Sequence, residues 1–101
     1  MSRWAKHALE ALARGESAVV TPHGNSMRPK VMSGARVTLE PCQADEAQVG
    51  DIVLTRVKGT YYLHLVKAVQ PDGRVLIGNN RGGTNGWTKA VYGRAVVIEN
   101  P

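Results

Sequence analysis

The 101-residue sequence has a single cysteine, Cys42, so the chain cannot form an internal disulfide. Its three histidines, His7, His23 and His64, are too scattered to give a zinc-binding spacing with that cysteine. Disulfides are rare in the reducing cytosol and common in small secreted domains. The scarcity of cysteine therefore favours a cytoplasmic protein, and we expect no metal site.

Long apolar runs are also missing. The longest, such as residues 95–98, fall far short of the roughly 20 apolar residues that a membrane-spanning helix needs. The first residues lack the charged-then-apolar pattern of a signal peptide. Residues 78–87 are rich in glycine and asparagine but carry no lysine-serine phosphate-loop pattern. We therefore expect a soluble protein with no membrane span, no nucleotide and no other cofactor.

The length and the ordinary apolar content of 43% predict one globular domain over residues 1–101. The net charge is +5, and residues 52–98 hold seven basic side chains against one acid, Asp72. This excess is compatible with an acidic peptide or a nucleic acid as partner. The solvated sheet face of a basic protein is the favoured interpretation, because the charges are spaced and not clustered with aromatic residues.

Residues 2–14 are predicted to form a helix. Ser2 is a good N-terminal cap and Gly15 a good C-terminal stop. An apolar stripe with helical spacing lies between them: Ala5, Ala8, Leu9 and Leu12. We expect Trp4 to extend this stripe as a packing anchor.

After Gly15 the pattern is that of strands, which gives a β domain over residues 18–99. Six strands are predicted, at residues 18–21, 36–40, 52–57, 61–69, 74–77 and 91–99. Lys58-Gly59 and residues 70–73 supply tight turns, and Gly93 indicates a bulge or close packing. Residues 41–50 and 78–87 are expected to be loops, with Cys42 an inert surface thiol and Trp87 an anchor. The predicted fold is mainly β, a coiled antiparallel sheet or barrel-like domain with one N-terminal helix.

The most informative stretch is GNSMRP, residues 24–29. Ser26 stands between a glycine and a proline, which give the backbone an unusual path and favour a presented hydroxyl. The run GxSMxP resembles the nucleophile segment of the signal peptidases and the LexA-type self-cleaving repressors. The resemblance continues at residues 33–37 (SGARV), 49–54 (VGDIVL) and 62–66 (YLHLV). It implies that Ser26 attacks a peptide bond.

A serine hydroxyl needs a base to accept its proton. In this superfamily the base is a lysine in bacterial signal peptidases and LexA-type proteins, and a histidine in the signal peptidases of the endoplasmic reticulum and archaea. His64 matches the histidine branch. Strand alternation should turn Lys67 to the opposite face, Lys58 is expected in a turn, and no family pattern supports Lys30 as the base.

The histidine enzymes orient the imidazole with an aspartate in a GDN run. Here Asn79 stands at that position in Gly78-Asn79-Asn80, and Asn85 lies further on. For the oxyanion we expect the backbone N–H of Ser26 together with a second donor near Gly24 or Asn25. Met27 is expected to fill the core below Ser26, and His23 to lie in a surface loop.

These features predict a soluble serine endopeptidase-like protein that uses a Ser-His dyad, Ser26 and His64, to cleave an extended peptide or protein segment. The alternative is a catalytically inactive relative that binds protein or, less favoured, nucleic acid. A self-cleaving repressor is the weakest hypothesis, because the residues before Ser26 leave room for one helix.

Overall fold

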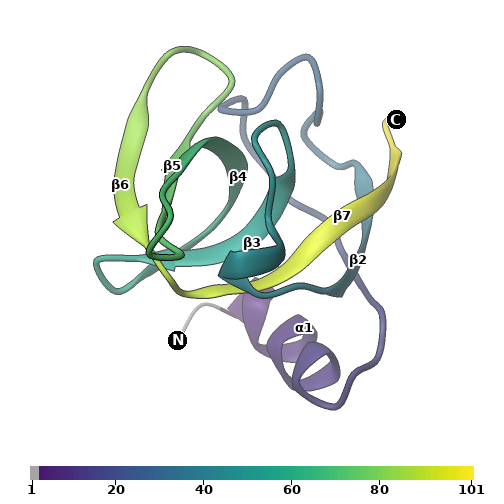
Figure 1. The fold of residues 1–101 in the computed structure, drawn as a ribbon. Coiled ribbons are helices and arrows are strands. Elements are labelled where there is room, and N and C mark those ends of the chain that lie inside the picture. The colour runs from purple at the N-terminus through teal and green to yellow at the C-terminus, as the bar shows by residue number, and fades with distance from the viewer. Residues whose placement is uncertain (1–2) are drawn as a thin grey trace.

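The computed structural model describes residues 3–101 and shows one α-helix followed by a seven-stranded sheet (Figure 1). The elements are α1 (Arg3–Ala13), β1 (Ala18–Val20), β2 (Arg36–Pro41), the short 3-10 helix η1 (Ala44–Glu46), β3 (Ile52–Val57), β4 (Thr60–Val69), β5 (Val75–Gly78), β6 (Thr84–Thr88) and β7 (Val91–Glu99). The mainly β fold with one N-terminal helix is confirmed.

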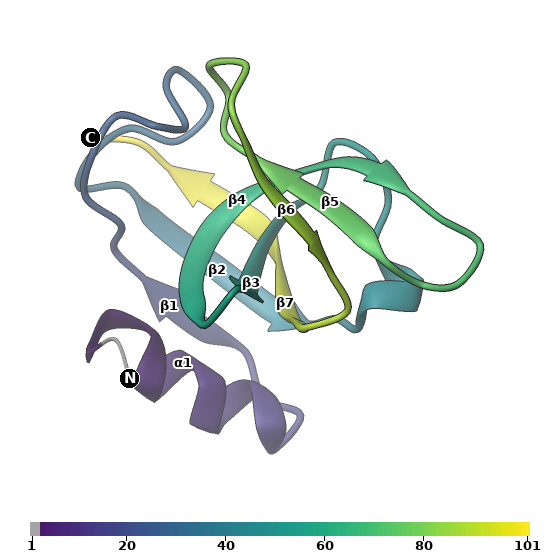
Figure 2. The ribbon, with the colours of Figure 1, turned by 90° about the vertical axis from the view of Figure 1, so that its left-hand side faces the viewer.

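The strands form one antiparallel sheet with the order β1-β2-β7-β3-β4-β5-β6. The sheet is strongly coiled, so that β4, β5 and β6 curl over one face (Figure 2). The end of β6 thereby returns to β3, where the Thr88 hydroxyl donates to the Arg56 carbonyl at 2.7 Å. The next turn adds a bond from the Arg56 N–H to the Ala90 carbonyl at 2.9 Å.

Both predicted turns are present. Lys58 and Gly59 have φ values of 50° and 83°, which are typical of a two-residue type I′ hairpin between β3 and β4. Gly73, with φ of 92°, donates its N–H to the Gln70 carbonyl at 3.0 Å between β4 and β5. These turns place consecutive strands side by side and so fix their register.

Strand β6 was not expected, since residues 78–87 were predicted to be a loop. Its sequence, TNGWT, does not alternate between apolar and polar residues, and the poor strand formers Asn85 and Gly86 lie within it, with Gly86 at a φ of 137°. Pairing with β5 makes it a strand. The prediction that Trp87 anchors this segment is wrong, because its side chain is 40% exposed at the sheet edge.

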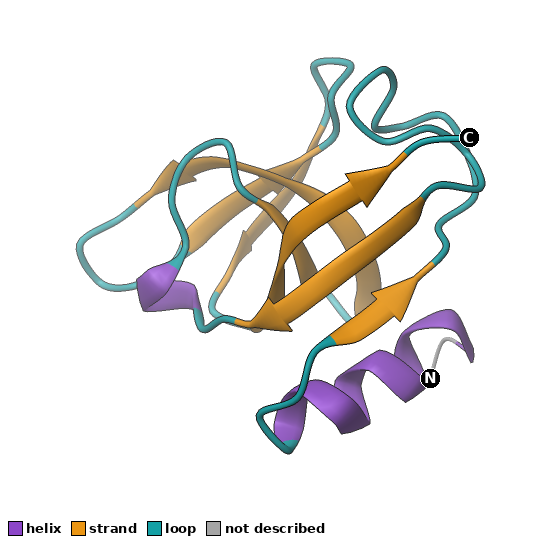
Figure 3. Ribbon diagram, turned by 90° about the vertical axis from the view of Figure 1, so that its right-hand side faces the viewer, coloured by secondary structure: helices purple, strands orange, loops and turns teal. Residues whose placement is uncertain are grey.

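Helix α1 lies against β1 and β2 (Figure 3). Of the predicted stripe, Ala5, Ala8 and Leu12 are buried there and Leu9 is partly buried. Its C-terminal end is a Schellman motif in which Glu16 donates to Ala11 and Gly15, with φ of 81°, donates to Leu12. The proposed cap Ser2 lies outside the described residues. No helix within residues 3–101 has the length and apolar character to cross a membrane.

Alternating strand residues fill two core clusters on opposite faces of the sheet. One face, which includes Leu39 and Leu54, packs with α1. The other, which includes Val53 and Ile77, also holds Cys42. The prediction of a surface thiol is therefore wrong, because Cys42 is only 4% exposed and burial raises the pKa of its thiol. Both properties agree with its predicted inertness.

Candidate active site

Ser26 lies in the segment that joins β1 to β2, which we call the Ser26 loop (residues 21–35). The loop is anchored from below by Met27 and Val31, whose side chains are 4% and 3% exposed. A hydrogen bond of 3.0 Å from the Val31 N–H to the Met27 carbonyl closes the turn between them. Met27 thus fills the core as expected, while the neighbouring Ser26 is exposed.

Two distant segments brace the Ser26 loop. The backbone N–H of Asn80 donates to the Ser26 carbonyl, and its side-chain amide donates to the Arg28 carbonyl, both at 2.9 Å. At the C-terminal end, Asn100 accepts a hydrogen bond from the Met32 N–H at 2.8 Å. The position of Ser26 therefore depends on the turn between β5 and β6 and on the residues after β7.

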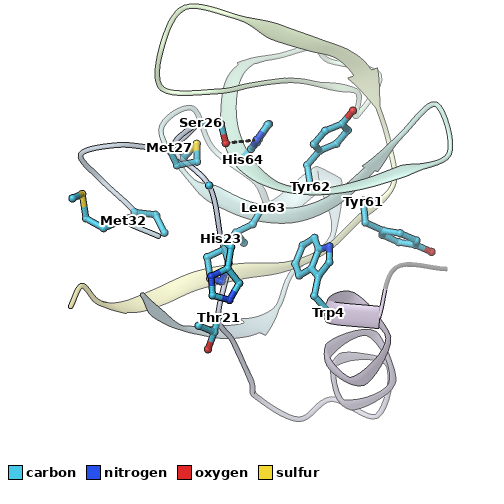
Figure 4. A pocket seen from close by; sticks show the side chains of 13 residues that line it. Trp4, Thr21, His23, Ser26, Met27, Met32, Tyr61, Tyr62, Leu63 and His64 are labelled. Atoms are coloured by element: carbon cyan, nitrogen blue, oxygen red, sulfur yellow. Dashed lines mark hydrogen bonds between the residues drawn. The ribbon is translucent and has the colours of Figure 1, made fainter. Parts of the chain in front are cut away.

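His64 lies on β4, is 8% exposed, and faces the loop. Its Nε2 atom is 3.1 Å from the Ser26 Oγ atom (Figure 4). Tyr62, two residues earlier on the same face of the strand, lies with its ring centre 4.9 Å from that of the imidazole. The structure therefore brings Ser26 and His64 into hydrogen-bond contact across 38 residues of sequence.

The second ring nitrogen of His64, Nδ1, is 2.7 Å from the Oδ1 atom of Asn85 on β6. An amide oxygen only accepts, so Nδ1 carries the proton and Nε2 is left to accept the Ser26 hydroxyl proton. Asn79 was expected at this position, but its Oδ1 instead accepts the N–H groups of Arg81 and Gly83 within its own turn. Asn85, and not Asn79, contacts the imidazole.

The environment of His64 keeps its imidazole neutral. Burial lowers the pKa of His64 below its ordinary value, and the hydrogen bond with Asn85 opposes this effect only in part. At neutral pH the ring is therefore an acceptor rather than a cation. The arrangement can remove a proton from the serine hydroxyl.

The backbone around Ser26 presents donors as well. Gly24 already donates its N–H to the Ser33 hydroxyl at 3.2 Å, which engages the donor expected there. Within residues 3–101, neither Asn25 nor Ser26 uses its backbone N–H in a hydrogen bond, so both remain open to a ligand.

Ser26 and His64 open into a cavity of about 310 Å³. Its other walls come from the Ser26 loop, from the start of β4 and from α1, and include Trp4, Met27, Val31, Met32, Tyr61 and Leu63. His23, expected in a surface loop, is exposed and also lines this cavity. Trp4, which was expected to be a packing anchor, is 37% exposed there.

The basic side chains of residues 52–98 do not form one patch. Arg74 pairs with Asp72 at 2.8 Å and Arg94 with Asp51 at 3.6 Å. The Arg56 guanidinium lies 5.7 Å from the centre of the Tyr61 ring. In the described part of the chain, His, Cys, Asp and Glu form no group of three suited to a metal ion.

A family model described as Peptidase S24-like matches residues 3–85. This range includes α1, Ser26, His64 and Asn85. None of the curated proteins matches the chain.

Proposed function

Because the chain belongs to the Peptidase S24-like family, we propose that it is a serine endopeptidase with Ser26 as nucleophile and His64 as general base. One observation carries the proposal, the chain of contacts from Ser26 Oγ to His64 Nε2 at 3.1 Å and from His64 Nδ1 to Asn85 Oδ1 at 2.7 Å. A nucleophile, a base and a group that orients the base are thereby within reach of one another.

In the proposed reaction, Ser26 Oγ attacks the carbonyl carbon of the scissile peptide bond while its proton passes to His64 Nε2. The tetrahedral intermediate collapses when the imidazolium gives that proton to the leaving amine, which leaves an acyl ester on Ser26. Water then attacks the ester, loses a proton to His64, and the proton returns to Ser26 Oγ as the acid is released. The net change is hydrolysis of one peptide bond.

The open backbone N–H groups of Asn25 and Ser26 are the proposed donors to the oxyanion. Their loop is held by Asn80 and Asn100, so these donors are positioned before the substrate arrives. Asn85 acts as a positioning residue, because its oxygen fixes the imidazole tautomer that leaves Nε2 free. It carries no charge, so it stabilises the imidazolium less than an aspartate does.

Strand β4 offers the substrate an open edge beside His64. Residues 60–64 pair with β3 on one side only, since pairing with β5 begins at Leu65. An extended peptide that adds along this edge as a strand brings one of its carbonyl groups to Ser26 and one of its side chains to the cavity. The proposed substrate is accordingly an extended segment of a peptide or protein.

The proposal is tested by labelling with a serine-reactive fluorophosphonate. The intact protein should be labelled at Ser26, and Ser26→Ala should abolish labelling. His64→Ala should slow labelling by about 10²- to 10⁴-fold, the usual contribution of a general base. Mass spectrometry of the labelled peptide identifies the site.

Ser17 provides a matched control, because it is an exposed hydroxyl just before β1 and does not line the cavity. Ser17→Ala should be labelled at a rate close to that of the unaltered protein. Equal labelling of Ser26→Ala and the unaltered protein would remove Ser26 as nucleophile. Absence of labelling at every pH would leave the alternative, a peptidase-fold binding module without catalysis.

A further inference from the structure

The cavity beside Ser26 is larger than the proposed reaction requires. Its volume is about 310 Å³. A dry protein cavity of about 150 Å³ already accommodates a benzene molecule. The space next to the nucleophile is therefore sufficient for the largest natural side chains.

The walls of this cavity are suited to an apolar occupant. Met27, Val31 and Leu63 form its floor as buried side chains. No Asp, Glu, Lys or Arg is among the described residues that line it. A charged side chain placed there would lose its water without gaining an ionic partner, which is unfavourable.

Trp4 and Tyr61 add aromatic surface at the end of the cavity next to α1 (Figure 4). α1 is fixed to the sheet by Ala5, Ala8 and Leu12, so Trp4 is not needed to bury the helix. Its indole remains 37% exposed at the cavity. A large apolar ligand would cover this surface and gain aromatic contacts.

We propose that this cavity is a specificity subsite that accepts a large apolar or aromatic side chain of the substrate next to the scissile bond. Trp4, supplied by α1, is a specificity-determining residue of the subsite. The inference rests on the proposed function, because it uses Ser26 to place the peptide. It defines the substrate class as peptides with a bulky apolar residue at the cleavage site.

Peptide binding to the Ser26→Ala protein tests the subsite without requiring catalysis. The probes are blocked seven-residue peptides of glycine and serine that differ only in the central residue, which is alanine, phenylalanine or glutamate. The phenylalanine peptide should bind about 10- to 100-fold more tightly than the alanine peptide, as expected for burial of a large apolar side chain. The glutamate peptide should bind no better than the alanine peptide.

The second tryptophan provides both a reporter and a control. Trp87 is 40% exposed and lies outside the cavity, so Trp87→Phe leaves Trp4 as the sole indole. In that background the Trp4 emission should shift to shorter wavelength when the phenylalanine peptide binds. Trp4→Ala should reduce the preference for phenylalanine over alanine by about fivefold or more, whereas Trp87→Ala should leave it unchanged.

Equal affinity for the alanine and phenylalanine peptides would overturn the subsite, and so would an unchanged Trp4 emission at saturation. Failure of the phenylalanine peptide to bind at millimolar concentration would also overturn the subsite. If fluorophosphonate labels Ser26 but the peptides are not distinguished, the subsite fails and the peptidase stands. If the peptides are distinguished but labelling fails, the subsite stands in a non-catalytic binding module.

Discussion

At the scale of single residues, two opposing effects set the pKa of His64. Burial disfavours the imidazolium and lowers its pKa, while the hydrogen bond to Asn85 favours it, and burial has the larger effect. The imidazole is therefore neutral over most of the pH range in which proteins work. Asn85 also selects the tautomer, because its oxygen accepts only from a protonated Nδ1.

The labelling rate should follow the neutral fraction of His64. It should be constant above pH 7 and fall as the pH drops, since protonated Nε2 cannot accept the Ser26 proton. Because the pKa is lowered, the half-maximal rate should lie below the ordinary histidine value of about 6.5. Measurement of the fluorophosphonate rate between pH 4.5 and 8.5 checks this expectation.

The Asn85→Asp variant should shift this pH dependence of the labelling rate in a defined direction. A carboxylate at the position of the amide stabilises the imidazolium, so the acidic limb should move up by about one pH unit or more and the maximal rate should rise. Asn85→Ala should lower the rate without producing that upward shift. An identical limb in the unaltered protein and the Asn85→Asp variant would contradict the contact between Asn85 and His64.

The contact between Ser26 and His64 was predictable because each residue lies in a short run, GNSMRP or YLHLV, whose residue types are specific. Asn85 was harder to predict. Its strand lacks apolar alternation, so nothing in the sequence indicated that Thr84–Thr88 pairs with β5 and turns Asn85 toward β4. The sequence favours Asn79 instead, because Asn79 stands where the histidine enzymes carry the aspartate of their GDN run.

At the scale of secondary-structure elements, α1 depends on a glycine in β7. Leu12 packs directly over Gly93, where a Cβ atom would lie 2.8 Å from Leu12 Cδ1 and 3.1 Å from the Glu40 carbonyl oxygen. The pairing of β7 with β3 also shifts register next to this glycine, between Leu54 and Thr55. The close contact with Leu12 and the register shift both agree with the expectation of a bulge or close packing at Gly93.

Gly93→Ala should destabilise the fold by about 1 to 3 kcal/mol through overpacking against Leu12. Leu12→Ala alone should cost about 2 to 5 kcal/mol because it leaves a cavity. The double variant should cost less than the sum by about 1 kcal/mol, since the added methyl group occupies part of that cavity. Urea denaturation of the unaltered protein, the two single variants and the double variant gives the coupling free energy between positions 12 and 93.

Leu9→Ala is the matched control on the same helix, because Leu9 packs against the core and the side-chain atoms nearest to Gly93 belong to Leu12. Its effect should add to that of Gly93→Ala within a few tenths of a kcal/mol. If Leu9→Ala and Leu12→Ala showed the same coupling free energy with Gly93→Ala, the contact between Leu12 and Gly93 would not be the cause of the coupling.

The other strands were predictable because β-branched and apolar residues alternate between clear turn signals, as in IVLTRV before Lys58-Gly59. The exposure of the two tryptophans, 37% for Trp4 and 40% for Trp87, was not predicted. The local sequence pattern shows that Trp4 continues the apolar stripe of the helix. Only the three-dimensional structure shows that a cavity, and not packed core side chains, separates Trp4 from β4.

At the scale of the whole molecule, the positive charge is distributed rather than focused. Two of the seven basic residues between positions 52 and 98 are paired with carboxylates, and a third lies over an aromatic ring. The other four are spread over different elements: Lys58 in the β3–β4 turn, Lys67 on β4, Arg81 in the β5–β6 turn and Lys89 before β7. This arrangement favours a solvated surface over a nucleic-acid interface.

We therefore expect no retention of a 20-base-pair duplex in a mobility-shift assay at about 150 mM salt, where only several clustered phosphate contacts hold a complex. Single-stranded RNA of the same length serves as a second probe. A complex that persists at this salt and weakens steeply with more salt would instead support the nucleic-acid alternative.

The proposed site draws Ser26 from the loop before β2, His64 from β4 and Asn85 from β6, and the Ser26 loop is braced by Asn80 and Asn100. A ribosome makes these parts in order, so a growing chain holds Ser26 long before it holds the residues that position Ser26 and its base. The proposed site is complete only when β7 and Asn100 have emerged and docked. Synthesis itself thus delays the proposed cleavage until these residues are in place.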